Sequence, residues 1–508
     1  MHRYGRCTVH SSTLCGVEGV PVDVEVVVTR GLPGFFIVGM PDASIQEARE
    51  RIKAAIQACD FVMPGDRVVV NLAPGSLKKG GTGFDLPIAV GLLVATGQID
   101  PGIVTRFLIV GELSLEGWVR GVSGQLSHAL CAKEQGYDFL CGAAREGIIP
   151  VEGLEIRVLE RLYGLLRMEL ANPDPYVISS GLHAPDFRDI AGHETAKRVL
   201  QIAAAGGHGV LMMGPPGSGK TMLASRLPSI LPPLTRAEML ESAMVYSVVG
   251  EPADKVLAGI RPFRAPHHSS TLAGLVGGGK PLRPGEISLA HNGVLFLDEL
   301  AEFKPSVLQA LRQPLESGEV MITRADGNVR FPARFTLVAA SNPCPCGYYG
   351  DAEETCTCSP ARIEAYTGRI GGPLMDRIDM RIDVGRLSPE HVLASGEGTD
   401  SETLAVGVLR AREYRDWRIA TCGLSEEGSL SVADEKPASR VARLLEECAM
   451  DDKVFRQFEQ AAQRYHLSGR AIAKTLSVSR TIADIEQVKS VTWNQVAEAL
   501  LYRVGEKL

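Results

Sequence analysis

The sequence predicts an α/β protein whose core is a parallel sheet, preceded by an α+β region and followed by a helical region. Between residue 188 and about residue 395, apolar strand-like runs alternate with helix-like segments, as in a parallel sheet covered by helices. Within this stretch, a glycine-rich loop separates a strand-like run from a helix-like segment. With 508 residues, the chain is also too long for a single hydrophobic core, so we expect several domains.

The composition is that of an ordinary folded protein, with 45% hydrophobic and 22% charged residues. A net charge of −7 excludes an overall basic field that would draw the chain onto nucleic acid, but it permits a local basic groove or pore. The N-terminus lacks the apolar segment of a secretory signal. The most apolar run, at residues 86–97, is too short to span a bilayer. We therefore expect a cytoplasmic protein with no membrane partner.

The order of elements predicts three domains. In the first, residues 1–175, alternating valines at 22–28 and the run 67–72 predict strands, whereas residues 43–59 and 85–96 predict helices. Three prolines and little periodicity at 171–187 predict a boundary. The parallel-sheet core then covers residues 186–395. A polar linker beginning at residue 388 leads to a helical domain at 402–508.

The glycine-rich loop at residues 214–221 fits the P-loop pattern G-x-x-x-x-G-K-[ST] and lies between the strand-like run GVLMM and the helix-like run TMLASRL. In such a loop, glycines let backbone N–H groups surround phosphates, the lysine reaches the β- and γ-phosphates, and the final hydroxyl binds Mg²⁺. The alternative is a chance glycine turn before a helix. The sequence thus predicts ATP and Mg²⁺ as ligands of Gly214, Pro215, Pro216, Gly217, Ser218, Gly219, Lys220 and Thr221.

Two further apolar runs end in polar residues. The run 294–297 leads into Asp298 and Glu299, which are suited to hold Mg²⁺ and to polarise the attacking water, respectively. The alternative is a solvated strand end. The run 335–340 ends at Ser341 and Asn342, where an amide either contacts the γ-phosphate or the water, or caps a turn.

Four of the 11 cysteines cluster at positions 344, 346, 356 and 358. Nine turn-rich residues separate the two C-x-C pairs, so Cys344, Cys346, Cys356 and Cys358 can supply four thiolates to one tetrahedral Zn²⁺. Because four protein ligands leave no position for water, the predicted role is structural. The alternative is two reduced pairs without metal. Two adjacent histidines, His267 and His268, have no partner at metal-ligand spacing and are expected to be structural or to line a pore.

A β-hairpin is predicted at residues 319–331 because an Asp-Gly pair lies between two strand-like runs. We expect the tip to carry Arg324 and Arg330 as candidate DNA contacts. The alternative is a solvated surface hairpin.

Five segments occur in the order found in a known family: RPFRAPHHSSTLAGLVGGG, PGEISLAHNGVLFLDELAEF, LRQPLESGEV, NPCPCGYYGD and GPLMDRIDMRIDV. Over essentially its whole length, the chain resembles the magnesium-chelatase-like AAA+ ATPases of the YifB/ComM type. This resemblance implies a homo-oligomeric, hexameric ring and a DNA helicase that drives branch migration during natural transformation. It also implies a hairpin tip that points into a central pore.

The same resemblance implies roles for three residues. Asn342 matches the sensor-1 position, Arg377 matches an arginine finger that reaches the neighbouring subunit's γ-phosphate, and Arg470 matches sensor 2 in a helical lid. From the residues alone, each arginine can equally be a surface residue, and Arg369 or Arg381 can replace Arg377.

The first domain resembles the Lon-protease catalytic fold through APGSLKKGGTGFDLPIAVG and GELSLEGWVRGVSG. Thr82 takes the place of the nucleophilic serine, and Leu126, followed by Ser127 and His128, takes the place of the lysine. A hydroxyl nucleophile needs a base within hydrogen-bond reach, so an inert scaffold or ligand-binding module is expected. Lys78 and Lys79 can in principle replace the base, but their glycine-rich loop favours basic contact residues.

These observations lead to one functional hypothesis and two alternatives. The hypothesis is a ring-forming ATPase that moves along DNA. The first alternative is a chelatase-type motor that remodels a protein partner. The second is an ATP-dependent Lon-like peptidase, which the missing lysine opposes.

Overall fold

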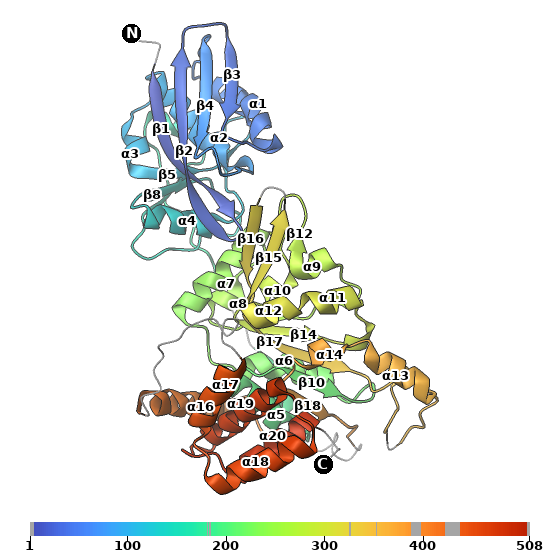
Figure 1. Ribbon diagram of the computed structural model, residues 1–508. Coiled ribbons are helices and arrows are strands. Elements are labelled where there is room, and N and C mark those ends of the chain that lie inside the picture. Colours follow the sequence, from blue (N-terminus) through green and yellow to red (C-terminus); the bar gives the residue numbers. More distant parts are fainter. Residues whose placement is uncertain are drawn as a thin grey trace.

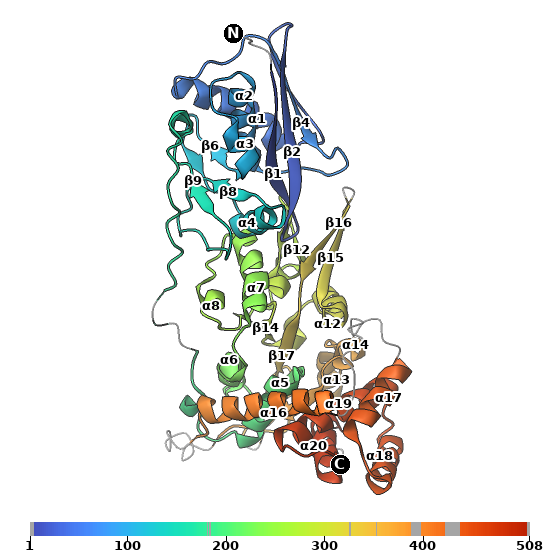
Figure 2. The ribbon, with the colours of Figure 1, turned by 90° about the vertical axis from the view of Figure 1, so that its left-hand side faces the viewer.

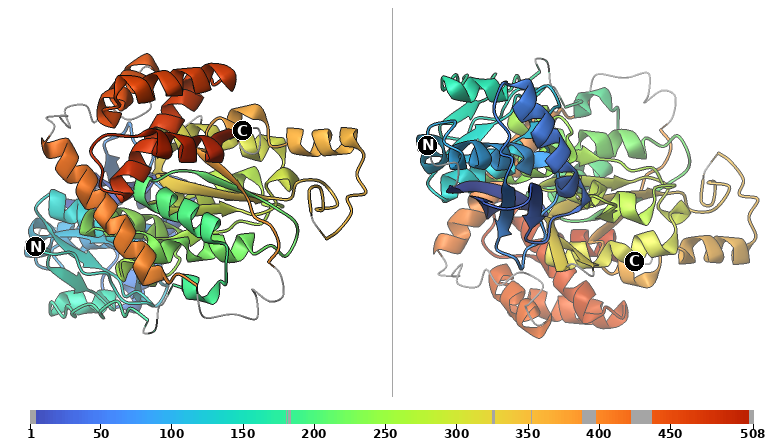
Figure 3. Two further views of the ribbon diagram at one scale, coloured as in Figure 1. Left: turned by 90° about the horizontal axis from the view of Figure 1, so that it is seen from below. Right: turned by 90° about the horizontal axis from the view of Figure 1, so that it is seen from above.

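The computed structural model describes residues 5–179, 181, 184–324, 327–351, 353–387, 398–421 and 437–504. The molecule is elongated, with the N-terminal sheet at one end and the C-terminal helices at the other (Figures 1 and 2). In the view from below the C-terminal helices lie nearest the viewer, and in the view from above the N-terminal sheet does (Figure 3).

The N-terminal region is a seven-stranded mixed sheet in the order β3-β4-β2-β1-β5-β8-β9. The predicted strands and helices at 22–28, 43–59, 67–72 and 85–96 are confirmed as β2, α1, β4 and α2. In β2, valines at alternate positions are buried because one face of the strand packs on the core. The elements are β1 (Arg6–Cys15), β2 (Glu18–Thr29), β3 (Gly34–Val38), α1 (Ala43–Ala58), β4 (Arg67–Ala73), α2 (Asp85–Ala95), α3 (Gly102–Arg106), β5 (Phe107–Val110), β6 (Glu112–Leu113), β7 (Val119–Arg120), α4 (Gln125–Glu134), β8 (Asp138–Cys141) and β9 (Ile156–Val158).

The central region contains a five-stranded sheet in the order β11-β14-β17-β10-β18, and every neighbouring pair is parallel. All carboxyl ends of the strands therefore lie at one edge. Its strands are β10 (Val210–Met213), β11 (Phe263–Arg264), β14 (Gly293–Leu297), β17 (Phe335–Ser341) and β18 (Met380–Asp383). Its helices are α5 (Glu194–Gly206), α6 (Lys220–Ile230), α7 (Arg236–Val249), α8 (Asp254–Leu257), α9 (Leu272–Val276), α10 (Glu286–Leu289), α11 (Pro305–Ala310), α12 (Arg312–Ser317), α13 (Pro360–Gly368) and α14 (Gly372–Met375).

Two hairpins extend from the central region toward the N-terminal sheet (Figure 1). The shorter one pairs β12 (Gly277–Gly278) with β13 (Arg283–Pro284), and the longer one pairs β15 (Glu319–Arg324) with β16 (Gly327–Pro332). The predicted longer hairpin is confirmed, although its second strand begins two residues earlier than expected. Residues 325 and 326 of the predicted turn lie outside the described residues.

The C-terminal region is helical in all of its described parts, 398–421 and 437–504, as predicted. Its helices are α16 (Ser401–Thr421), α17 (Pro437–Cys448), α18 (Asp452–Arg464), α19 (Gly469–Ile485) and α20 (Trp493–Val504). Buried charges link α16 to α19: Asp484 of α19 lies 3.1 Å from Nε of Arg418 in α16 and 3.0 Å from Nη2 of Arg480 in its own helix. Residues 388–397 of the predicted linker lie outside the described residues.

The N-terminal and central regions share one hydrophobic core. A single cluster of buried side chains contains Val17 and Leu126 from the first region and Leu211 and Leu295 from the second. At the same junction, the Gly124 N–H donates to the Ser247 carbonyl at 2.9 Å. This continuous packing holds the two regions in one orientation. Among the helices of the described residues, none combines the length and apolarity needed to cross a membrane.

Candidate active site

The P-loop connects β10 to α6 at the carboxyl edge of the central sheet. Gly217 and Gly219 adopt left-handed backbone angles, with φ of +79° and +85°, which glycine adopts without steric cost. At Gly214 the reason for glycine is space, because a Cβ there would lie 2.1 Å from the Val384 carbonyl oxygen. The predicted strand, loop and helix are therefore all present, and the loop packs directly against the chain leaving β18.

Lys220 is buried at the centre of this loop, with only 7% of its surface exposed. Its Nζ donates to the carbonyl oxygens of Gly214 and Pro215, both at 2.8 Å, and lies 3.3 Å from Ser218 Oγ. Burial lowers the pKa of Lys220, and Asp298 acts in the opposite direction. All three acceptors are neutral, so phosphate oxygens would form stronger, charge-assisted bonds with the same ammonium.

Strand order brings Asp298 to the start of α6. Asp298 follows β14, two strands away from β10, and its Oδ2 accepts a hydrogen bond from Thr221 Oγ1 at 2.7 Å. Its Oδ1 accepts from the Glu299 N–H at 2.9 Å. A carboxylate beside a hydroxyl provides the hard oxygen ligands that Mg²⁺ prefers, so these residues fit the predicted ion.

Glu299 has an unusual backbone and an unexpected partner. Its φ of +52° is uncommon for a residue other than glycine. Its Oε2 lies 3.0 Å from Nδ1 of His268, and its side chain is 51% exposed. His268 follows β11, which pairs with β14, so the two strand ends place the histidine beside the carboxylate. The sequence analysis missed this contact, and a signal for it was the position of His268 just after a strand-like run.

Asn342 lies at the same edge of the sheet. It follows β17, the strand between β10 and β14, and the Gly214 N–H donates to the carbonyl of the preceding residue, Ser341, at 3.2 Å. The structure therefore gathers Asn342, Lys220, Thr221, Asp298 and Glu299 at one edge.

Arg377 and Arg470 are not part of this group. The Arg377 carbonyl oxygen lies 3.7 Å from the point where a Cβ on Gly209 would be, at the amino end of β10. Since β10 has four residues and a strand rises by about 3.3 Å per residue, the P-loop begins about 13 Å away. Arg377 pairs with Glu316. Arg470 is exposed at the start of α19, and α19 meets the same amino edge through Lys474, 2.7 Å from Asp379.

The two alternative finger residues also have acidic partners. Arg369 Nη1 lies 3.5 Å from Glu302 Oε2, and Arg381 Nη2 lies 3.9 Å from Asp383 Oδ1. Neither contact distinguishes these arginines from ordinary surface residues.

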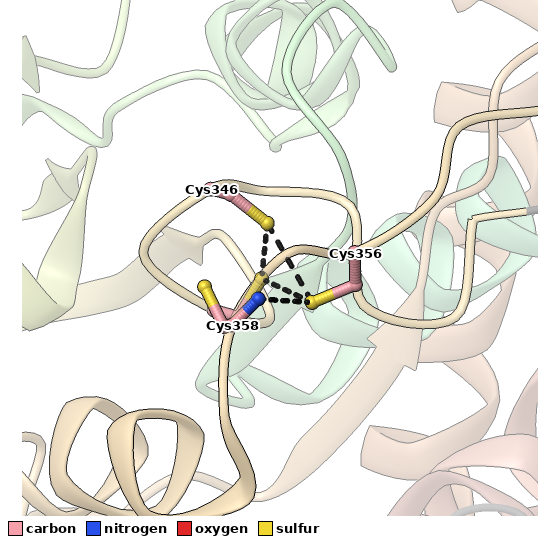
Figure 4. A group of neighbouring side chains, drawn as sticks. Cys346, Cys356 and Cys358 are labelled. Atoms are coloured by element: carbon pink, nitrogen blue, oxygen red, sulfur yellow. Dashed lines mark hydrogen bonds between the residues drawn. The ribbon is translucent and has the colours of Figure 1, made fainter.

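The four clustered cysteines converge in space, and Figure 4 labels three of them, Cys346, Cys356 and Cys358. Sγ of Cys344 lies 3.3 Å from that of Cys346 and 3.7 Å from that of Cys356, and the last two are 3.6 Å apart. All four sulfur atoms, including that of Cys358, lie within 4.8 Å of one another. Zinc–sulfur bonds of about 2.3 Å place the thiolates of a tetrahedral site about 3.8 Å apart, so this group fits zinc.

The backbone around the cluster favours thiolate. N–H groups of Tyr348 and Thr357 lower the pKa of the Cys346 thiol to about 6. The Cys358 N–H also donates to Cys356 Sγ at 3.4 Å, but burial and the neighbouring thiols of Cys346 and Cys344 outweigh this bond and raise the pKa of Cys356 to about 12. Among the ten cysteines in the described part of the chain, none forms a disulfide. The cluster is therefore a candidate metal site with reduced sulfurs.

In the N-terminal region, the residues at the Lon-like positions have fixed partners. Thr82 Oγ1 donates to the Glu112 carboxylate, and Leu126 is buried in the core. The interpretation of Lys79 as a basic contact residue is wrong. Its side chain is fully buried, and Nζ donates to the carbonyls of Gly39, at 3.1 Å, and Pro74. The prediction was wrong because the glycine-rich loop folds inward around the ammonium of Lys79.

The hairpin residues Arg324 and Arg330 lie on opposite faces, which corrects the expectation that both belong to the tip. Arg324 pairs with Gly327 at the tip, whereas Arg330 pairs with Met321, three residues farther down. Because side chains alternate along a strand, an offset of three places them on different faces. Arg324 Nη2 donates to the Gly279 carbonyl at 2.5 Å, whereas Arg330 is 68% exposed.

The sequence analysis also missed two cations in the adjacent short hairpin. Lys280 and Arg283 are exposed there, next to the point where Arg324 contacts Gly279. The signal was the segment GGGKPLR, in which cations follow three glycines.

The parallel sheet with a P-loop after β10 and an Asp-Glu pair after β14 defines an α/β nucleotide-binding protein of the AAA+ class. Three family models match: magnesium chelatase subunit ChlI at residues 186–392, subunit ChlI of Mg-chelatase at 24–144, and the ChlI C-terminal model at 398–503.

Similar relatives extend over nearly the whole chain. Competence protein ComM of Haemophilus influenzae is 40% identical, with 98% of each chain covered. Uncharacterized protein YifB of Salmonella typhimurium is 39% identical, covering 98% of this chain and 97% of its own. The magnesium-chelatase 38 kDa subunit of Cereibacter sphaeroides is 27% identical over 31% of this chain and 52% of its own. The chain therefore belongs to the YifB/ComM family of magnesium-chelatase-like AAA+ ATPases.

Proposed function

We propose that this protein is a ring-forming ATPase that couples hydrolysis to movement along DNA. The observation that carries the ATPase half is the meeting of Lys220, the Thr221–Asp298 pair and Glu299 at one sheet edge. These are the groups that phosphoryl transfer to water requires, namely a cation for phosphate oxygens, ligands for Mg²⁺ and a carboxylate for the water.

In this proposal, the P-loop amides and Lys220 bind the phosphates, and Glu299 accepts a proton from the attacking water. Mg²⁺, when bound by Thr221 and Asp298, neutralises charge on the phosphates. Asn342 contacts the γ-phosphate or the water. His268, 3.0 Å from Glu299, is a positioning residue that orients this carboxylate.

Assembly as a homo-oligomeric ring, which we propose to be a hexamer, gives Arg377 a role at a neighbouring site. The distance of about 13 Å along β10 prevents this arginine from serving the P-loop of its own chain. An arginine in trans adds positive charge where negative charge develops during phosphoryl transfer. We also assign Arg470, which is exposed on the proposed helical lid, to a neighbouring site.

Exposed cations on the two hairpins support the DNA half of the proposal. Lys280, Arg283 and Arg330 are exposed on adjacent hairpins that extend from the ATPase core, and Arg324 joins these hairpins. Since the net charge is −7, binding to phosphates has to be local. The printed name of the relative in Haemophilus influenzae, a competence protein, is consistent with a DNA substrate.

We further propose a Lon-like scaffold domain at residues 1–175, the ATPase core at 186–395 and the helical lid at 402–508. Cys344, Cys346, Cys356 and Cys358 hold a structural Zn²⁺, which suits a reducing, cytoplasmic location. Elemental analysis of the purified protein should find close to one zinc per chain, and a metal-free, fully stable protein would refute this part.

The test of function is the ATPase rate with and without single-stranded, duplex and forked DNA. The proposal expects at least one of these DNAs to raise turnover at low salt. A chelatase-type motor or a Lon-like peptidase predicts no such stimulation. Turnover that none of the three DNAs changes would overturn movement along DNA in favour of a protein-remodelling motor, without affecting the ATPase assignment.

A further inference from the structure

The cysteine loop touches the P-loop directly, through one glycine and one proline. We propose that the metal-bound cysteine loop positions the P-loop, so that metal binding strengthens nucleotide binding. This inference rests on the zinc site proposed above and adds a regulatory role to it. The zinc site and its coupling to the P-loop can be refuted separately, because zinc content tests the site and nucleotide affinity tests the coupling.

Gly347 makes the contact. It is buried, and a Cβ built on it would lie 2.6 Å from Cδ and 2.8 Å from Cγ of Pro216 in the P-loop. A proline ring is attached to the backbone at both ends, so pressure on it moves the P-loop backbone rather than a flexible side chain. The φ of Gly347 is +89°, in the left-handed region that favours glycine, and its N–H donates to the Cys344 carbonyl at 3.0 Å. The glycine in contact with the P-loop is thus part of the turn that presents Cys344 and Cys346.

The cysteine loop also contacts the residues that follow β18. The Arg386 guanidinium lies 5.3 Å from the centre of the Tyr348 ring, and its Nε lies 3.5 Å from Asp351 Oδ2. Two residues before Arg386, the Val384 carbonyl packs on Gly214, the first residue of the P-loop. The cysteine loop therefore lies against the P-loop at Gly347 and against a segment that itself contacts the P-loop.

The four thiols alone do not hold this arrangement firmly. In the described chain they form no disulfide, and the sulfur contacts among Cys344, Cys346 and Cys356, at 3.3 to 3.7 Å, are weak hydrogen bonds. A metal that binds all four fixes the turn at Gly347 and, through it, the place of Pro216. Since P-loop amides must point at the phosphates, a shift of about 1 Å is enough to weaken binding substantially.

Two glycine substitutions distinguish the effect of contact with Pro216 from the effect of backbone strain. Gly347→Ala places a methyl group against Pro216, whereas Gly350→Ala introduces similar strain, at a φ of +79°, with nothing within 4 Å of the new Cβ. With zinc retained, we expect Gly347→Ala to weaken ADP binding about tenfold, as coupling between two sites predicts. Gly350→Ala, which makes no contact with the P-loop, should change the ADP affinity by no more than about twofold. Calorimetric titration with ADP, with zinc measured in the same samples, gives the comparison. Equal ADP affinity in zinc-loaded Gly347→Ala and native protein would overturn the coupling.

A second measurement uses the native chain and does not depend on how the variants fold. Coupling between two sites is reciprocal, so bound ADP must strengthen metal binding by the factor by which metal strengthens ADP binding. We expect ADP to lower the amount of zinc that a competing chelator removes at equilibrium, and to do so in native protein but not in Lys220→Ala. Zinc removal that is the same with and without saturating ADP would overturn the proposal, even if each chain holds one zinc.

Discussion

The N-terminal and central regions each contain a lysine in a glycine-rich loop that precedes a helix, yet the two loops differ in what can reach them. Lys79 is fully buried, and its ammonium donates to the Gly39 and Pro74 carbonyls in the interior. Lys220 donates to its own loop, at a sheet edge where Asp298 and Glu299 also lie. We infer from the comparison that Lys220, whose loop lies where strand ends gather polar groups, is the lysine suited to bind a ligand, whereas Lys79 is held in the interior.

The acidic residues of the two regions differ in the same way. Asp85 is fully buried at the start of α2, and its carboxylate accepts two bonds from Arg51, at 2.7 and 2.9 Å. Burial raises the pKa of Asp85, and Arg51 opposes this rise. Glu299, by contrast, is half exposed and contacts a single histidine in the described structure. We therefore expect substitutions in the first region to affect stability and those in the second to affect turnover.

The largest expected effect is on turnover, from Arg377→Ala. An arginine finger contributes about 10³–10⁵ in rate, equivalent to roughly 4–7 kcal/mol of barrier, so this variant should bind ATP normally and hydrolyse it very slowly. Mixing it with Lys220→Ala subunits should restore some activity, because certain interfaces then join an intact P-loop to an intact arginine. Steady-state ATPase assays on mixed rings measure this rescue. If the Arg377→Ala variant alone hydrolysed ATP at the native rate, Arg377 would have no role in hydrolysis.

The next effect is on stability, from Arg51→Ala in the N-terminal region. Removing one partner of a buried ion pair costs about 3–5 kcal/mol, because the remaining carboxylate is left buried and unpaired. The matched control is Arg49→Ala, since Arg49 is 48% exposed and pairs with the exposed Glu50. Urea unfolding should separate the two variants clearly. If both lose the same small amount of stability, the Asp85 pair is not a structural element of this region.

A smaller effect is expected on DNA binding, from Arg330→Ala. Each lost phosphate contact makes the plot of log affinity against log salt shallower by about one unit for duplex DNA. Arg236→Ala is a suitable control, because Arg236 is similarly exposed, at 69%, and also has a glutamate partner, Glu152, as Arg330 has Glu319, but it lies on α7. Fluorescence anisotropy at several salt concentrations gives both slopes. A slope for Arg330→Ala identical to that of the Arg236→Ala control would show that Arg330 does not contact DNA phosphates.

The smallest effect is expected from Thr82→Val, which removes the hydroxyl at the position of the Lon nucleophile. Its hydrogen bond to the Glu112 carboxylate contributes about 1.5–3 kcal/mol to stability, and ATP turnover should not change. The assay is casein or peptide hydrolysis alongside ATP hydrolysis. Peptidase activity in the native protein that Thr82→Val abolishes would show that the N-terminal region is catalytic after all.

Much of this site could be predicted from the sequence, because its residues follow strand-like runs. The P-loop pattern and the pair Asp298-Glu299 are local signals, and a parallel sheet necessarily brings them to one edge. The contact between His268 and Glu299 depends on which strands are neighbours, which no local pattern specifies. The burial of Lys79 was missed for a similar reason, since glycines on both sides of a lysine are compatible with an inward or an outward loop.

The longer hairpin also has a feature that a local sequence pattern does not predict. The sequence predicted the two strands correctly, but the face of each arginine depends on register, and a shift of one residue reverses it. The contact between Gly347 and Pro216 was also beyond prediction, since it joins two loops separated by more than a hundred residues.

The central claim is that nucleotide chemistry takes place at the edge of the central sheet, with Glu299 as the base. It is tested most directly by measuring ATP binding and single-turnover hydrolysis in Glu299→Gln. We expect binding close to native and hydrolysis slower by about 10²–10⁴, the usual contribution of a positioned general base, so that the protein stays loaded with ATP. Hydrolysis at the native rate in this variant would contradict the account.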